Sequence, residues 1–107
     1  MVDAAKAEKA LDWIRDNADA LGKARAERTY LDGFLKSKRA ILMNASVCVR
    51  LGDKEAEALA HPEYLALLSS HRDVLHEEER LRFLMVAASA TLELYRTQEA
   101  SRRAEKL

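Results

Sequence analysis

Apolar residues recur every three or four positions through the first half of the chain, and this spacing is the strongest constraint on its fold. Such steps place side chains on one face of an α-helix, whereas a strand would alternate with a period of two. One heptad position is shared by Ala7, Ile14, Leu21, Arg28, Leu35, Leu42 and Val49. Arg28 is its only charged member. The pattern predicts one long helix over about residues 3–51, with a break near residues 17–22 as the alternative.

Residues 50–63 contain the clearest interruptions of the helical pattern. Gly52 is expected to follow the end of the first helix, because glycine is favoured just beyond a helix C-terminus. Asp53 is then expected to cap a short helix over about residues 54–60. The residue before a proline avoids the helical conformation, so His61 should end the short helix. Pro62 suits a first helical turn and should begin a last helix that reaches about residue 103.

The composition agrees with a fold that is helical throughout. Good helix formers dominate, and the chain contains only three glycines and one proline in 107 residues. β-branched and aromatic residues are scarce, which argues against a sheet. We therefore predict an all-α fold, a long antiparallel helical hairpin of two long helices plus a short connecting helix. It should form a single helical domain, residues 1–107, that assembles into an oligomeric helical bundle or ring.

The prediction of an oligomer rests on one stretch of the last helix. Between Leu81 and Leu94 the sequence is apolar nearly all round the helix, whereas a helix in a two-helix hairpin buries only one side. A second apolar side implies a second contact surface. The expected interface between subunits comprises Leu81, Phe83, Leu84, Met85, Ala88 and Leu92.

The net charge is zero, but basic and acidic residues are unevenly distributed along the sequence. Residues 23–50 are mostly basic, and residues 53–79 are mostly acidic. A basic helical face beside Tyr30 and Phe34 is typical of single-stranded nucleic acid binding, in which cations contact phosphates and aromatic rings stack on bases. The candidate phosphate-binding residues are Lys23, Arg25, Arg28, Lys36, Lys38 and Arg39. The alternative is a solvated helix surface whose cations pair with the acidic second half.

Other site chemistries find little support in the sequence. His71 and His76 stand five apart, on different helix faces, so they are not a metal-binding pair. Cys48 is the only cysteine and is expected to be a small buried apolar residue in a reducing cytoplasm. The serines have no surrounding nucleophile motif, and no glycine-rich phosphate loop exists. We expect no enzyme activity, no cofactor, no secretion signal and no membrane span.

Several stretches of the second half resemble the C-terminal helix of the UvsY-type recombination mediators of tailed phages. The resemblance lies in the run from Leu67 to Leu75, which reads Leu-Leu-Ser-Ser-His-Arg-Asp-Val-Leu, and in two later segments. These segments are residues 81–84 and 90–93. The adjacent Lys38 and Arg39 before an Ala-Ile-Leu run resemble the family's first helix more loosely. The family's Lys-Ala-Arg-Leu element, which contacts DNA, is absent, and the nearest basic match is Lys36, Lys38 and Arg39.

The resemblance implies a non-enzymatic protein that binds single-stranded DNA as a ring-like homo-oligomer. Such mediators displace or remodel the single-strand-binding protein and help to load a RecA-like recombinase. The expected location is then the cytoplasm of a bacterial host cell.

A second hypothesis needs no nucleic acid. In it, the chain is an adaptor or inhibitor that binds a protein partner through Trp13 and the apolar stripes. The acidic residues Glu77 to Glu79 could then form the active surface and mimic DNA.

Overall fold

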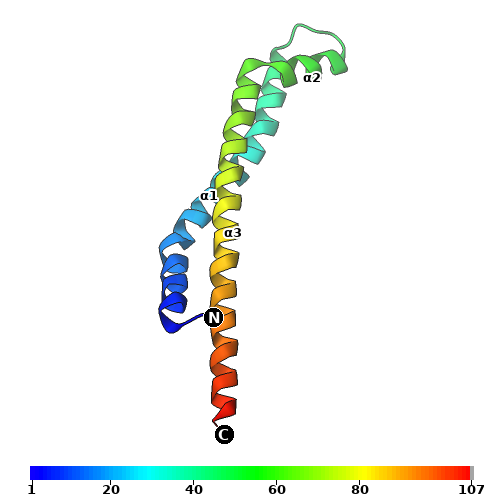
Figure 1. Cartoon of the computed structure of the whole chain (residues 1–107). Helices are drawn as coiled ribbons and strands as arrows, with labels where there is room; N and C mark the ends of the chain where they lie inside the picture. Colours follow the sequence, from blue (N-terminus) through cyan, green and yellow to red (C-terminus); the bar gives the residue numbers. More distant parts are fainter. Residues whose placement is uncertain (107) are drawn as a thin grey trace. The chain divides into compact units, whose positions relative to one another are not determined.

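The computed structural model describes residues 1–106, and these residues form helices without a strand. Helix α1 spans Ala4–Ala45, α2 spans Leu51–Ala60 and α3 spans Pro62–Glu105 (Figure 1). The predicted all-α fold of two long helices and a short connecting helix is confirmed. Asp3 precedes the first helix, and its Oδ1 accepts a hydrogen bond of 2.8 Å from the Lys6 N–H, as expected for an N-cap residue.

The connection between α1 and α2 differs from the prediction. Helix α1 ends at Ala45, six residues earlier than expected, and Val47 and Val49 are almost fully exposed in the segment that follows. Gly52 does not end the first helix, because it lies inside α2 with a negative φ. Asp53 lies in the first turn of α2, where a carboxylate favours the helix dipole, but it is not the N-cap. Val47 and Val49 cover no apolar surface, so they add no packing that would extend α1 to residue 51.

The start of α3 follows the sequence rule for proline. His61 has an extended backbone with φ −67° and ψ 135°, and α3 begins at Pro62. The Leu65 N–H donates to the carbonyl of His61, so the first turn closes although proline lacks an N–H. The predicted boundary at His61-Pro62 is confirmed.

The described residues group into two compact units, and both long helices run through both of them. The hairpin unit comprises residues 23–78, and the terminal unit comprises residues 1–22 and 79–106. In the hairpin unit, ion pairs join Arg28 to Glu78 and Lys38 to Glu63, so α1 and α3 run antiparallel. Helix α2 lies at the end of this hairpin, in the connection from α1 to α3 (Figure 1). The prediction of a single domain stays a prediction.

Each long helix has an inward-facing row of residues, which we call its seam, with steps that alternate between three and four. The α1 seam consists of Ala7, Ala10, Ile14, Asn17, Leu21, Ala24, Arg28, Leu31, Leu35, Lys38 and Leu42. The α3 seam consists of Tyr64, Leu67, His71, Val74, Glu78, Leu81, Met85, Ala88, Leu92 and Tyr95. All of these side chains are buried or half-buried. The regular steps are those of coiled-coil core positions.

The terminal unit contains its own buried apolar residues, Ala7 and Leu81. The Val2 N–H donates a hydrogen bond of 3.3 Å to Gln98 Oε1, which joins the start of the chain to α3 within this unit. None of the helices among residues 1–106 combines the length and the apolar content that a membrane-spanning helix requires.

Candidate interaction surfaces

The hairpin unit contains a buried carboxylate, that of Glu78, the last residue of the unit. Glu78 is only 4% exposed, and the Arg28 guanidinium donates to both of its oxygens, with 3.1 Å between Nη2 and Oε1. Arg28 also donates to Asp32 at 3.0 Å, and His71 Nε2 lies 2.6 Å from the other oxygen of Asp32. A charge removed from water is stable only when it is paired and hydrogen-bonded. Four residues of α1 and α3 therefore form one connected polar network.

The contacts of this network shift the pKa values of Glu78, Asp32 and Arg28. The hydrogen bond from Arg28 is the largest influence on Glu78 and holds its pKa below the usual value, although burial opposes the shift. The hydrogen bond with His71 lowers the pKa of Asp32 in the same way. The partnership with Glu78 raises the pKa of Arg28. Glu78, Asp32 and Arg28 are thus ionised at neutral pH, and their contacts hold Arg28 in place within the seam.

Most of the cations expected to bind phosphate have carboxylate partners in the hairpin unit. Besides Arg28, Arg25 lies 3.6 Å from Glu78. Lys38 Nζ lies 2.6 Å from Glu63 of α3, and Arg39 lies 3.5 Å from Glu55 of α2. The acidic second half therefore faces the basic stretch, which is the alternative that the sequence left open.

Lys23 and Lys36 complete the expected phosphate-binding set. Both side chains are exposed on α1, and Lys36 makes none of the ion pairs found among residues 1–106. Lys36 is the strongest remaining candidate for a phosphate contact in this set.

Neither unit has an excess of charge. The hairpin unit carries nine basic and nine acidic side chains, and so does the terminal unit. Nucleic-acid-binding domains characteristically carry a basic patch that attracts the phosphate backbone. In the hairpin unit, carboxylates lie beside many of the cations and neutralise their positive charge, so no strongly basic patch forms.

The two aromatic residues proposed for base stacking lie on one exposed face of α1. The Tyr30 and Phe34 rings are stacked on one another, with their centroids 6.0 Å apart and their planes 8° apart. Tyr30 is 64% exposed, and Ile41 continues the same face two turns later. The face is therefore an apolar and aromatic surface.

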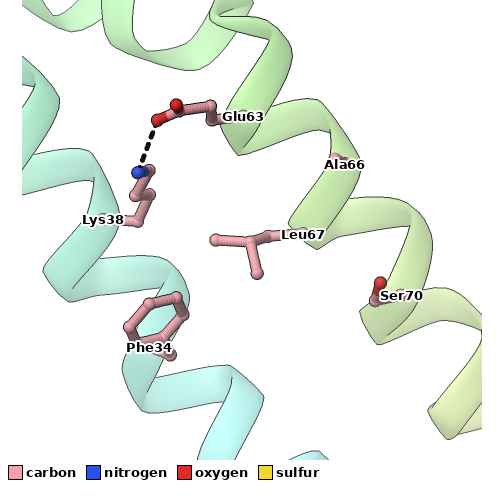
Figure 2. Close-up of a pocket in the computed structure, with 6 residues that line it drawn as sticks. All are labelled: Phe34, Lys38, Glu63, Ala66, Leu67 and Ser70. Atoms are coloured by element: carbon pink, nitrogen blue, oxygen red, sulfur yellow. Dashed lines mark ion pairs between the residues drawn. The ribbon is translucent and has the colours of Figure 1, made fainter.

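A shallow groove of about 300 Å³ adjoins this face in the hairpin unit. Figure 2 shows Phe34 and Lys38 of α1 on one side and four residues of α3 on the other, with Leu67 reaching toward Phe34. The groove is lined by Phe34, Lys38, Glu63, Ala66, Leu67 and Ser70. The ion pair between Lys38 and Glu63 spans one end (Figure 2). The volume of the groove is at the lower limit for small-molecule sites, and its lining suits one or two apolar side chains.

The residues predicted for the oligomer interface fall on different sides of α3. Leu81 is 2% exposed and lies in the seam, where Met85, Ala88 and Leu92 are half-buried. Only Phe83 and Leu84 of the predicted set are exposed. The second apolar side is a row that we call the α3 stripe. It consists of Phe83, Val86, Ala87, Ala90 and Leu94, all of them exposed.

The sequence reasoning missed the roles of Glu78, Asp32 and His71. The signal that could have found two of them is the spacing of the α3 seam, in which His71 and Glu78 occupy core positions by count. A carboxylate at a core position of one helix and an arginine at a core position of the other predict a pair between them.

The segment between α1 and α2 holds one further polar cluster. Glu57 of α2 accepts hydrogen bonds from the Ser46 hydroxyl at 2.7 Å and from the Cys48 thiol at 3.0 Å, and these bonds lower the pKa of Glu57. Cys48 is half-buried in the segment between α1 and α2, so the prediction that it is a small buried apolar residue was wrong. Residues 1–106 contain no group of three side chains that could hold a metal ion.

Trp13, the proposed docking residue, is half-buried beside the seam of α1 in the terminal unit.

Comparison of the chain with protein-family models, with curated proteins and with solved structures gives no significant match. The resemblance to the UvsY-type mediators therefore stays a prediction.

Proposed function

We propose that the chain is a non-enzymatic helical module that works by associating with the apolar faces of other helices. The observation that carries the proposal is a contrast in the surface. Several cations of the hairpin unit, among them Arg28, Lys38 and Arg39, are paired with carboxylates of the same unit, whereas large apolar side chains remain exposed on both units. Uncovered apolar area is what association can remove from water.

The arrangement of these apolar side chains supports the proposal more than their number. A single exposed leucine is ordinary on a protein surface, but a continuous row along a helix is typical of an interface. The terminal unit presents such a row, the α3 stripe, and the hairpin unit presents Tyr30, Phe34 and Ile41 beside the groove. Buried apolar residues are few by comparison, namely Ala7, Leu31, Ala58 and Leu81.

The second candidate is the function that the resemblance implies, a recombination mediator that binds single-stranded DNA as a homo-oligomer. In that role it would help to load a RecA-like recombinase in place of the single-strand-binding protein. The observation that favours it is the exposed, stacked pair of Tyr30 and Phe34, on which a base could stack, with the exposed Lys36 on the same helix.

A binding experiment separates the two candidates. The full chain is titrated into three fluorescent probes, and anisotropy is read at low and at moderate salt. The probes are an amphipathic helical peptide with leucine at heptad core positions, a scrambled peptide of the same composition, and a single-stranded oligonucleotide. We expect the amphipathic peptide to bind at both salt concentrations, because apolar association is insensitive to screening. We expect neither of the other two probes to match it.

The opposite result has an equally clear meaning. Tight oligonucleotide binding that falls steeply with salt indicates several phosphate contacts and favours the mediator. In that case Lys36→Ala should weaken binding, while Lys9→Ala, an exposed lysine of the terminal unit, should leave it unchanged. Failure of the folded chain to bind the amphipathic peptide at either salt concentration refutes the helix-binding proposal.

A further inference from the structure

The α3 stripe lies on the side of α3 opposite to the seam. Phe83, Val86, Ala90 and Leu94 are separated by steps of three, four and four, so they form a straight row on one helix face. Phe83 is 62% exposed and Val86 is 57% exposed, whereas Leu81 on the other side is 2% exposed. Helix α3 therefore has one covered and one uncovered apolar face.

A row of alternating charges runs along one flank of the α3 stripe. In chain order it reads Glu79, Arg82, Glu93 and Arg96. Within the helix Arg82 lies 2.7 Å from Glu79 and Arg96 lies 3.2 Å from Glu93. Both pairs lie at the solvent-facing surface of the helix, where such ion pairs contribute little to stability. The Arg82 guanidinium also lies over the ring of Phe83, 4.7 Å from the ring centroid, so it is already beside the stripe. Weak surface contacts of this kind can exchange partners at small cost.

We propose that the α3 stripe binds the same stripe of a second copy of the chain, with the two α3 helices antiparallel about a two-fold axis. The axis passes beside Ala87 on the stripe side of the helix, at a height between residues 87 and 88. The proposal rests on the proposed function, in which apolar helix faces associate, and it names the partner. Its support is the complementarity of the charged flank with itself.

The order of the charges selects the antiparallel direction. About a two-fold axis between residues 87 and 88, Glu79 lies as far before the axis as Arg96 lies after it. Arg82 and Glu93 are related in the same way. In an antiparallel helix pair the same flank of each helix faces itself, so Glu79 meets the second copy's Arg96 and Arg82 meets its Glu93. All four contacts join opposite charges.

The parallel arrangement lacks this match. In a parallel pair, each flank faces the opposite flank of the other helix, as the g and e positions of a coiled coil do. The opposite flank of the α3 stripe carries Arg80, Leu84 and Thr91, so it lacks the matching row of alternating charges. The charged row would then lose its partners.

The same axis makes the apolar side chains interlock. The point on the second helix that faces Phe83 is position 92, which lies between Ala90 and Leu94 along the stripe. The Phe83 ring thus enters the space between them, as a knob enters a hole. Ala87 and Ala90 near the axis are small, and they let the two backbones approach closely.

The contact is limited to about three turns of each helix, which is small beside the roughly 1,600 Å² buried in a standard interface. We therefore expect a dimer that forms and dissociates with concentration. Sedimentation velocity of the wild-type chain at concentrations up to about 1 mM should show the transition from monomer to dimer.

The test of the register uses two exposed charges. In Arg82→Glu the new carboxylate faces Glu93 of the second copy, and in Glu93→Arg the new guanidinium faces Arg82. Each variant alone should dimerise about tenfold more weakly than the wild type. An equimolar mixture should recover wild-type affinity, because both cross-pairs then join opposite charges. Arg72→Glu, an equal charge change at an exposed α3 position of the hairpin unit, is the matched control and should have no effect.

Helix content by circular dichroism checks that each variant is folded. A mixture that associates as weakly as its components overturns the antiparallel register, and a wild-type chain that stays monomeric at every concentration overturns the dimer. Either failure leaves the peptide-binding experiment to judge the proposed function independently. If the amphipathic peptide also fails to bind, the proposed function falls as well.

Discussion

The two units differ in the residues that occupy their seams. In the hairpin unit the seam includes Arg28 and Glu78, which are charged and meet in a buried ion pair. In the terminal unit the α3 seam from Leu81 to Tyr95 is apolar or aromatic, and a second apolar row faces the outside of the same helix. The hairpin unit therefore pairs its seam charges internally, whereas the α3 helix of the terminal unit leaves a continuous apolar row uncovered.

The difference separates two roles. Charged seam residues fix the register of α1 against α3, and exposed apolar residues supply free energy for binding another chain. A polar residue at a helix-pair core position fixes register, because a shifted pairing would leave a charge buried without a partner. The pair of Arg28 and Glu78 has this property in the hairpin unit. Apolar contacts discriminate poorly between registers, but they supply free energy for binding. The terminal unit is accordingly the better candidate for a contact with another chain.

The largest expected effect is on the covered face of α3. Leu81→Ala removes a nearly buried side chain and should lower the free energy of unfolding by about 3 kcal/mol, measured by denaturant titration of the helical signal at low protein concentration. Leu94→Ala truncates the same residue type on the exposed stripe, and it should cost less than about 0.5 kcal/mol under those conditions.

In the self-association experiment, Leu94→Ala should have a larger effect than Leu81→Ala, the reverse of their order in stability. Leu94→Ala should weaken self-association of the folded chain, because Leu94 borders the space that Phe83 of the second copy enters. Equal stability losses for the two variants would contradict the assignment of one covered and one uncovered face.

The next effect concerns the hairpin unit. Arg28→Met leaves the Glu78 carboxylate buried with only the more distant Arg25, and it should lower the melting temperature by roughly 10 °C. Glu78→Leu should cost less, since Arg28 is partly exposed and can turn toward water. The double variant should recover most of the loss, because it buries no unpaired charge.

Arg25→Ala is the control, because Arg25 is an exposed neighbour of the same carboxylate and should shift the melting temperature only slightly. If the double variant is no more stable than Arg28→Met alone, the cost does not come from an unpaired Glu78.

The spacing of the residues was enough to predict much of this architecture. Steps of three and four predicted two long helices, and the rule for residues before proline placed the start of α3 at Pro62. The first helix was predicted too long, because Val49 continues the apolar spacing in the sequence but is exposed in the structure. The spacing of apolar residues does not show whether the rest of the fold offers a surface for them to pack against.

The candidate site was harder to predict, because pairing between helices depends on their alignment. The sequence shows that Arg28 and Lys38 are basic, but the residues opposite them are fixed only once α1 and α3 are in register. Glu78 and Glu63 then become their partners. The α3 stripe was anticipated as a second apolar side, but its members separate from the seam only when burial is known.

The smallest effect is the pH dependence of the network, and its sign follows from the lowered pKa of Glu78. Folding holds this pKa below 4.5, so the contribution of Glu78 to stability is fully present above pH 4.5 and is lost as the pH falls through the folded-state value. In this window the unfolded chain binds more protons than the folded one, and the stability of the wild type should decrease with acidification. The Arg28→Met/Glu78→Leu variant should lose stability less steeply, by up to about one proton in the slope. Denaturant titrations from about pH 6 to about pH 3 measure both slopes, and parallel slopes would mean that other carboxylates, such as Asp32, account for the acid sensitivity.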